Sequence, residues 1–148
     1  MSAESHGDWG KLKLVKITDS RKFWYLYDEL ETSMGGTVLH RGCIVEAFRN
    51  GHLYGLEVEE TDEMYEKNER EKNSIFCRSK HGEFSWYLLP CFCINKEDWA
   101  MMIWTHSRAR KKGFATKLTE LLGIKTAYIP LASDSLDFWK ARGVEMVY

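Results

Sequence analysis

A basic loop in the second half of the chain holds the residues whose types and spacing could do chemistry. Four cations stand within five positions and a glycine follows them: Arg108, Arg110, Lys111, Lys112 and Gly113. Where such a loop leads into a helix, its backbone N–H groups converge at the positive end of the helix dipole, and anions bind there. The loop is therefore predicted to hold a phosphate group, with a solvated surface loop as the alternative.

The segments on both sides of this loop have the patterns of a strand and a helix. Residues 99–104 are all apolar, which is typical of a buried strand. After the loop, Phe114, Leu118 and Leu121 recur at the spacing of one helix face, and Gly123 stands where a C-terminal cap belongs. A strand, a basic loop and a helix, in this order, are expected to position the phosphate site.

The pattern of the whole chain predicts a single domain over residues 1–148. The expected elements are a strand at 11–17, a helix capped within 18–20 and running to about 31, a helix at 40–49, strands at 75–78, 84–89, 91–94 and 99–104 with turns at 80–82 and 95–98, a helix at 114–122, a strand at 126–129, a helix from 133 or 134 to 142, and a strand at 144–148. Pro90 is expected to break the register of its strand. This order predicts an α/β fold with a mixed, mostly antiparallel sheet flanked by helices.

Residues 52–73 are less regular and strongly acidic in their first part. The carboxylates there are Glu57, Glu59, Glu60, Asp62, Glu63 and Glu66. Such runs are usually solvated helices or loops, and this is the expectation here. The alternative is an acidic rim that attracts a cationic amine.

Composition limits the classes of protein to consider. The chain has 148 residues, the length of one domain, and its net charge of −1 gives no global field toward nucleic acid or a membrane. No apolar stretch reaches the roughly 18–20 residues that span a bilayer, and the first residues lack the pattern of a signal peptide. The expected location is therefore cytoplasmic, with no membrane contact and with nucleic acid as a disfavoured partner.

The cysteines and histidines give no metal pattern. Of the 4 cysteines only Cys91 and Cys93 are close together, and their spacing is not that of a standard zinc site or disulfide. Buried, reduced thiols are therefore expected. No two histidines stand at i and i+4, so no metal site is predicted. His106 lies nearest the basic loop, where a role at the start of the loop is favoured over a catalytic one.

Two segments carry a resemblance to a known family. The spacing Arg110-x-x-Gly113-x-Ala115 resembles the Gln/Arg-x-x-Gly-x-Gly/Ala cofactor signature of the GCN5-related N-acetyltransferases, and the likeness extends over residues 105–118. Residues 138–144, Phe-Trp-Lys-Ala-Arg-Gly-Val, look like the Phe-Tyr-x-x-x-Gly-Phe segment of that family's last helix. The expected order of elements also resembles that of the family, so the resemblance spans most of the chain.

The resemblance implies a cofactor and an activity. The activity would be transfer of an acetyl group from acetyl-CoA to a primary amine, carried by a small molecule or a protein. Backbone groups of residues 103–105 would pair with the pantetheine arm, and N–H groups of residues 110–115 would hold the pyrophosphate. The implied cofactor-binding residues are Ile103, Trp104, Thr105, Arg108, Arg110, Lys111, Lys112, Gly113, Phe114, Ala115, Thr116 and Trp139.

The catalytic residues are less well defined by the resemblance. Glu97 and Asp98 begin the central strand, where a carboxylate could accept the amine proton, although both also suit a turn. Family members often place a Tyr after the Phe of the last helix, to protonate the departing thiolate. This chain has Trp139 there, whose indole N–H is not a useful acid, so Tyr128 is the expected substitute.

The sequence leaves two alternative functions open and also predicts a homodimer. Trp139 favours a catalytically silent module of the same fold, which binds CoA or a partner without turnover. The basic loop with exposed aromatics would suit a small nucleic-acid-binding protein. Family domains commonly add one more strand after the last one, but this sequence stops at Tyr148. The expected sheet therefore lacks that strand, and a homodimer contact is predicted to cover its edge.

Overall fold

A computed structural model of the chain describes residues 3–5, 11–34, 38–59, 86–97, 99–106, 113–128 and 136–147. Within these ranges seven strands form one sheet, in the order in which they follow one another along the chain. They are β1 (Ala3–Ser5), β2 (Lys11–Lys16), β3 (Leu53–Glu59), β4 (Trp86–Lys96), β5 (Trp99–Thr105), β6 (Thr126–Tyr128) and β7 (Glu145–Val147). Neighbours are antiparallel from β1 to β5, and β5, β6 and β7 run parallel. The prediction of an α/β fold with a mixed, mostly antiparallel sheet is confirmed.

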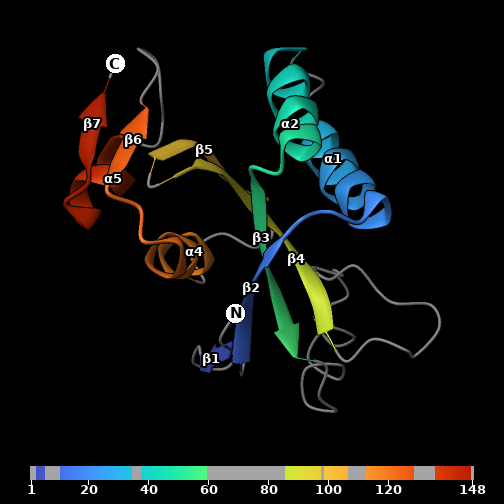
Figure 1. Cartoon of the computed structure of the whole chain (residues 1–148), viewed down its shortest axis with the longest axis horizontal. Coiled ribbons are helices and arrows are strands. Elements are labelled where there is room, and N and C mark those ends of the chain that lie inside the picture. The colour runs from blue at the N-terminus through green and yellow to red at the C-terminus, as the bar shows by residue number, and fades with distance from the viewer. Residues whose placement is uncertain are drawn as a thin grey trace.

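Two pairs of helices cover the two faces of this sheet (Figure 1). The described helices are α1 (Ser20–Met34), α2 (Val38–Asn50), α4 (Phe114–Leu122) and α5 (Leu136–Arg142). Alternation along β4 shows that the pairs are on opposite faces. Phe92 and Ile94 pack into the cluster of α1 and α2, whereas Cys91 and Cys93 pack into the cluster of α4 and α5. We refer to these as the α1/α2 face and the α4/α5 face.

Helix α1 begins at the cap that its sequence predicts. The carboxylate of Asp19 accepts a hydrogen bond of 2.7 Å from the backbone N–H of Arg21, one of the donors that the first helical turn leaves unpaired. This hydrogen bond holds the pKa of Asp19 below its usual value. Phe23, Leu26 and Leu30 then form the buried stripe of the helix, as their spacing predicts.

Strand β3 corrects the prediction for the acidic region. Residues 53–59 form a strand between β2 and β4, where the sequence suggested a solvated helix or loop. Glu57 is 3% exposed and pairs with Lys22 of α1, and its second oxygen lies 4.0 Å from Lys13 of β2. Two cations offset the cost of burying this carboxylate, so the residue is part of the fold rather than of an acidic rim. The rest of the run, from Glu60 onward, lies outside the described residues.

Strand β4 contains the register break that Pro90 predicts. Gly55 pairs with Phe92 and Glu57 with Leu88, so two steps on β3 match four on β4, and Pro90 is at the centre of the irregularity. A proline cannot donate to the sheet ladder, which accounts for the break. The strand predicted at 75–78 and the turn at 80–82 lie outside the described residues. In the described part of the chain, the antiparallel run extends over β1, β2, β3, β4 and β5.

Cys91 and Cys93 are buried and reduced, as predicted, on the α4/α5 face of β4. Burial raises the pKa of the Cys91 thiol to about 12 and raises that of Cys93 as well, so neither forms a nucleophilic thiolate near neutral pH. Cys43 departs from the prediction, because it is exposed on α2. The two strand cysteines act as small apolar side chains of the core.

Candidate cofactor site

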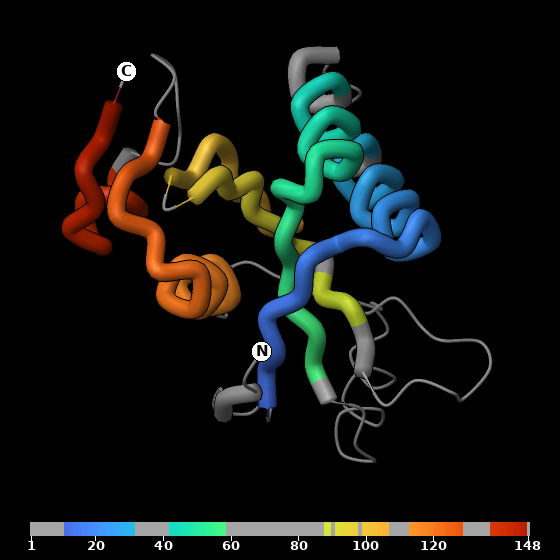
Figure 2. The backbone as a smooth tube through the Cα atoms, in the orientation of Figure 1, coloured from blue at the N-terminus to red at the C-terminus, as the bar shows by residue number. Residues whose placement is uncertain are grey.

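Among the described residues, strands β5 and β6 pair at their first residues. Trp99 pairs with Thr126 and Ala100 with Ala127, after which β5 continues to Thr105. Within the described part of the chain, no pairing with β6 continues along residues 101–104. Figure 2 shows β5 leading away from β6 beyond the paired residues. The two parallel strands therefore form a V that opens toward the end of β5.

The backbone of β5 is held on its other side by β4. Ile103 pairs with Cys93, and Thr105 with Cys91. The inner arm of the V is thus a strand whose remaining N–H and C=O groups point into the opening. An extended chain with amide groups can pair with such an edge as an additional strand.

A bulge in β5 stands at the apex of the V. Ile94 pairs with Met102 and Asn95 with Ala100, so Met101 is an extra residue on β5. The bulge changes the alternation of side chains along the strand. Ala100 packs into the α4/α5 cluster, whereas Met102 and Trp104 pack on the α1/α2 face. Bulges often re-aim side chains and backbone groups next to functional sites.

Helix α4 is preceded by a glycine in a conformation that strains most other residue types. Gly113 has φ 80 and ψ 10, in the left-handed region, and its carbonyl oxygen accepts the first helical hydrogen bond from Lys117, at 3.0 Å. Phe114 and Leu118 then anchor the helix in the α4/α5 cluster. This confirms the predicted helix and its C-terminal cap at Gly123, which is also left-handed.

The first turn of α4 is tied to α5. Arg142 donates a hydrogen bond of 2.6 Å from Nη1 to Oγ1 of Thr116. The guanidinium of the same arginine lies 5.0 Å from the centre of the Phe138 ring, within the range of a cation–π contact. The residues of the two predicted motifs, 105–118 and 138–144, are therefore joined in space.

The predicted cofactor residues occupy different environments. Ile103 and Thr105 are half-buried on β5, and Trp104 is buried against α1 and α2. Ala115 and Thr116 are half-buried in the first turn of α4. Trp139 is 2% exposed and belongs to the α4/α5 cluster. The predicted cations Arg108, Arg110, Lys111 and Lys112 lie outside the described residues.

The predicted catalytic residues are at both ends of this region. Tyr128 is the last described residue of β6 and is 43% exposed, one position beyond the paired Ala127. Glu97 is exposed in the turn between β4 and β5, with φ 59, and its carbonyl oxygen accepts a hydrogen bond from Asn95 Nδ2 at 2.9 Å. These features are those of a turn residue. Asp98 lies outside the described residues.

A histidine–carboxylate contact at the end of β5 was not predicted from the sequence. Nε2 of His106 lies 3.4 Å from Oε2 of Glu29 in α1, and the two side chains are 7% and 21% exposed. The imidazole also meets the ring of Trp104 edge-on, at 6.0 Å between centroids. This contact fixes the start of the basic loop against α1. Glu29 occupies an ordinary polar position of an amphipathic helix, so no sequence signal points to it.

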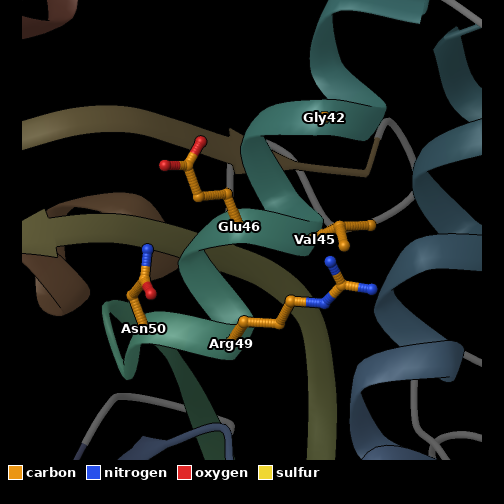
Figure 3. A pocket seen from close by; sticks show the side chains of 5 residues that line it. All are labelled: Gly42, Val45, Glu46, Arg49 and Asn50. Carbon is orange, nitrogen blue, oxygen red and sulfur yellow. The ribbon is translucent and has the colours of Figure 1, made fainter.

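A separate hollow is lined by residues of α2 (Figure 3). Its lining consists of Gly42, Val45, Glu46, Arg49 and Asn50. All five residues come from one helix, whereas ligand sites usually gather polar groups from several elements. The hollow shares no residue with the V of β5 and β6.

The described ranges contain no helix that is long and apolar enough to cross a membrane. They also contain no group of three or more His, Cys, Asp or Glu side chains arranged to hold a metal ion. Comparison of the chain with protein-family models, with curated proteins and with solved structures found no match.

Proposed function

We propose that the chain binds acetyl-CoA in the V between β5 and β6 and transfers the acetyl group to a primary amine, as its resemblance to the GCN5-related N-acetyltransferases implies. The observation that supports this best is the strand geometry. Among the described residues the parallel pair joins at Trp99–Thr126 and Ala100–Ala127, and the edge of residues 103 and 104 lies beyond the paired part, shortly before the basic loop in the sequence. Pantetheine carries two amides and can pair with such an edge.

The loop and helix after β5 supply the second element of the proposal. Gly113 brings a bare backbone to the N-terminus of α4, where N–H groups and the helix dipole favour a pyrophosphate. The cations of residues 108–112 precede it in the sequence. A phosphate bound there would place the rest of the cofactor along β5, and the four residue steps from Thr105 to Met101 span roughly 13 Å.

In this proposal, the thioester and the catalytic tyrosine meet at the bulge in β5. The thioester would lie near Met101, where β5 and β6 part, and Tyr128 stands at the same level on β6. Attack by a neutral amine forms the C–N bond and breaks the C–S bond. The thiolate that leaves would take a proton from the Tyr128 hydroxyl, which solvent then reprotonates, and the amine nitrogen would lose one proton to solvent or to a carboxylate such as Glu97 or Asp98.

One observation favours the silent-module alternative. Trp139 is packed in the core and occupies the position where the family often has a tyrosine acid. A module that binds CoA without turnover would keep the V, the loop and Gly113 but would have no use for Tyr128. The two functions therefore differ in turnover and in the role of Tyr128, and they agree on cofactor binding.

Calorimetric titration of acetyl-CoA into the wild-type chain and its variants tests the proposal. Arg110→Ala removes a charge-assisted contact and should cost about 1.5–3 kcal/mol, roughly ten- to a hundredfold in affinity. Lys11→Ala, which removes an exposed cation from β2, three strands away from β5, is the control and should bind as the wild type does.

Gly113→Val should cost at least as much as Arg110→Ala, because its side chain would fill the space of the phosphate. At φ 80 a valine also strains the backbone, so Gly113→Asn serves as the matched variant, since asparagine tolerates this conformation. Weakened binding by both variants is the expected result. Affinity equal to that of the wild type in both would move the cofactor elsewhere. Tight binding without turnover on any amine would support the silent module.

A further inference from the structure

The last turn of α5 carries an arginine that reaches the first turn of α4. Nη1 of Arg142 donates a hydrogen bond of 2.6 Å to Oγ1 of Thr116, and the guanidinium lies 5.0 Å from the centre of the Phe138 ring. Arg142 is exposed, but these two contacts hold its charged group in one place. Side chains of a helix tilt toward its N-terminus, so the Thr116 side chain leads toward Gly113. The guanidinium therefore lies within about one turn of the start of α4.

The charge of this guanidinium is not neutralised by a carboxylate. Among the described residues no Asp or Glu forms an ion pair with Arg142, although Glu120 lies one turn further along α4 and Glu145 follows three positions later in the chain. The first turn of α4 has no acidic side chain either. The last carbonyl groups of α5 accept hydrogen bonds from the N–H groups of residues 143 and 144, so they are already satisfied. The positive charge is thus available to an anion.

The donors of this pair suit a phosphate group. A guanidinium has five N–H groups, and the hydrogen bond to Thr116 uses one of them. The Thr116 hydroxyl accepts that bond, so its own hydrogen can be donated elsewhere. A guanidinium whose plane is fixed can present two parallel N–H groups to two oxygens of a phosphate, which an ammonium group cannot do.

The order of groups in CoA indicates which phosphate this is. In the proposed cofactor site the thioester lies near Met101, the pantetheine arm follows residues 103–105 and the pyrophosphate is bound at Gly113 and the basic loop. The ribose with its 3′-phosphate is the next part of the molecule, at the end of the pyrophosphate away from the pantetheine arm. Arg142 belongs to α5 rather than to the basic loop, and so supplies a cation from a second element.

We infer that Arg142, together with the hydroxyl of Thr116, binds the 3′-phosphate of CoA and selects CoA over cofactors that lack this group. This inference rests on the proposed function and adds a specificity-determining residue to it. The sequence resemblance does not assign this role, because Arg142 stands at an x position of the Phe-Tyr-x-x-x-Gly-Phe segment. The contact with Thr116 on α4 is what brings the residue to the cofactor site.

Calorimetric titration of CoA and of dephospho-CoA, which lacks only the 3′-phosphate, tests the inference. The wild type should bind CoA roughly five- to thirtyfold more tightly than dephospho-CoA. Arg142→Gln removes the charge and should remove most of this difference, through weaker binding of CoA alone. Arg142→Lys keeps the charge but loses the planar fork, so its preference should be intermediate. Lys140→Gln removes another exposed cation from the same helical turn and, as the matched control, should keep the wild-type preference.

The preference for CoA separates phosphate binding from a structural tie between the helices. If Arg142 only joined α5 to α4, Arg142→Gln would lower the melting temperature or weaken both ligands alike, and an unchanged preference would overturn the inference. Equal affinity of the wild type for CoA and dephospho-CoA would overturn it as well, while the proposed cofactor site would stand. A wild-type chain that binds neither ligand would refute the proposed function, and the inference with it.

Discussion

Tyr128 and Trp139 belong to opposite faces of the sheet. Tyr128 projects from the face of β6 opposite Ala127, whereas Trp139 is buried among α4, α5 and the strands beneath them. A residue buried in that way contributes packing, and its replacement acts on stability. An exposed phenol at the end of a strand contributes little packing. Removal of its hydroxyl should therefore change catalytic activity rather than stability.

Replacement of these two aromatics should therefore have opposite consequences. We expect Tyr128→Phe to lower kcat about 10²–10⁴-fold, the usual effect of losing a general acid, with little change in melting temperature. Trp139→Phe should lower turnover only modestly but cost about 1–3 kcal/mol of stability, because it leaves a cavity in the core. Steady-state kinetics and thermal unfolding of both variants check this. Full kcat in Tyr128→Phe would remove Tyr128 from the mechanism.

The sequence predicts single residues well where their role is local. Asp19 as a cap, Pro90 as a register break and Gly123 as a helix end follow from the chemistry of each side chain and its neighbours. Glu57 was misplaced because its burial depends on Lys22 and Lys13, which reach it through the tertiary fold. The same holds for the contact between His106 and Glu29, which joins a helix and a strand far apart in the chain.

At the scale of elements, local periodicity predicted α1, α2, β5 and α4 correctly. Local periodicity could not predict the register between neighbouring strands. The V depends on the register of Ala100 with Ala127, and the bulge on a mismatch between β4 and β5. Register is set by long-range packing, and a shift by one residue would turn every side chain to the other face. The strand β3 was missed because its carboxylates resembled those of a solvated segment.

The cap of α1 gives an element-level prediction with a defined pH dependence. Asp19→Ala should lower the free energy of unfolding by about 1 kcal/mol at pH 7, because the N–H of Arg21 loses its acceptor. Since the folded-state pKa of Asp19 is lowered, the advantage conferred by the carboxylate is complete above its unfolded pKa of about 3.9 and fades as the pH falls through the folded value.

Urea unfolding of the wild type, Asp19→Ala and Asp19→Asn at pH 7 and at low pH measures this effect. Asparagine also caps helices but carries no charge, so Asp19→Asn should be close to the wild type at both pH values. A difference between wild type and Asp19→Ala that grows on acidification would contradict the assigned role of the carboxylate.

At the scale of the whole molecule, the described sheet has two edge strands. The order of the described strands places β1 at one end and β7, with three residues, at the other. Figure 1 shows β7 and the marked C-terminus at the outer side of the sheet. A strand at an edge leaves backbone groups unpaired, and a short one limits how far another chain can pair with it.

We therefore keep the prediction that the β7 edge takes part in a homodimer. Light scattering at micromolar protein should give twice the monomer mass, falling toward the monomer on dilution. A monomer mass that does not change with concentration would rule the dimer out. This outcome would leave the proposed cofactor site untouched, since the V is formed within one chain.

The most direct test of the central proposal is amide hydrogen exchange with and without acetyl-CoA, resolved by residue. If the cofactor pairs with β5, the amides of residues 103–105 that point away from β4 should exchange more slowly when acetyl-CoA is bound. The amides at the start of α4, beside Gly113, should be protected with them, while those of β3 should not change. Protection confined to other elements, with residues 103–105 unaffected, would contradict the account.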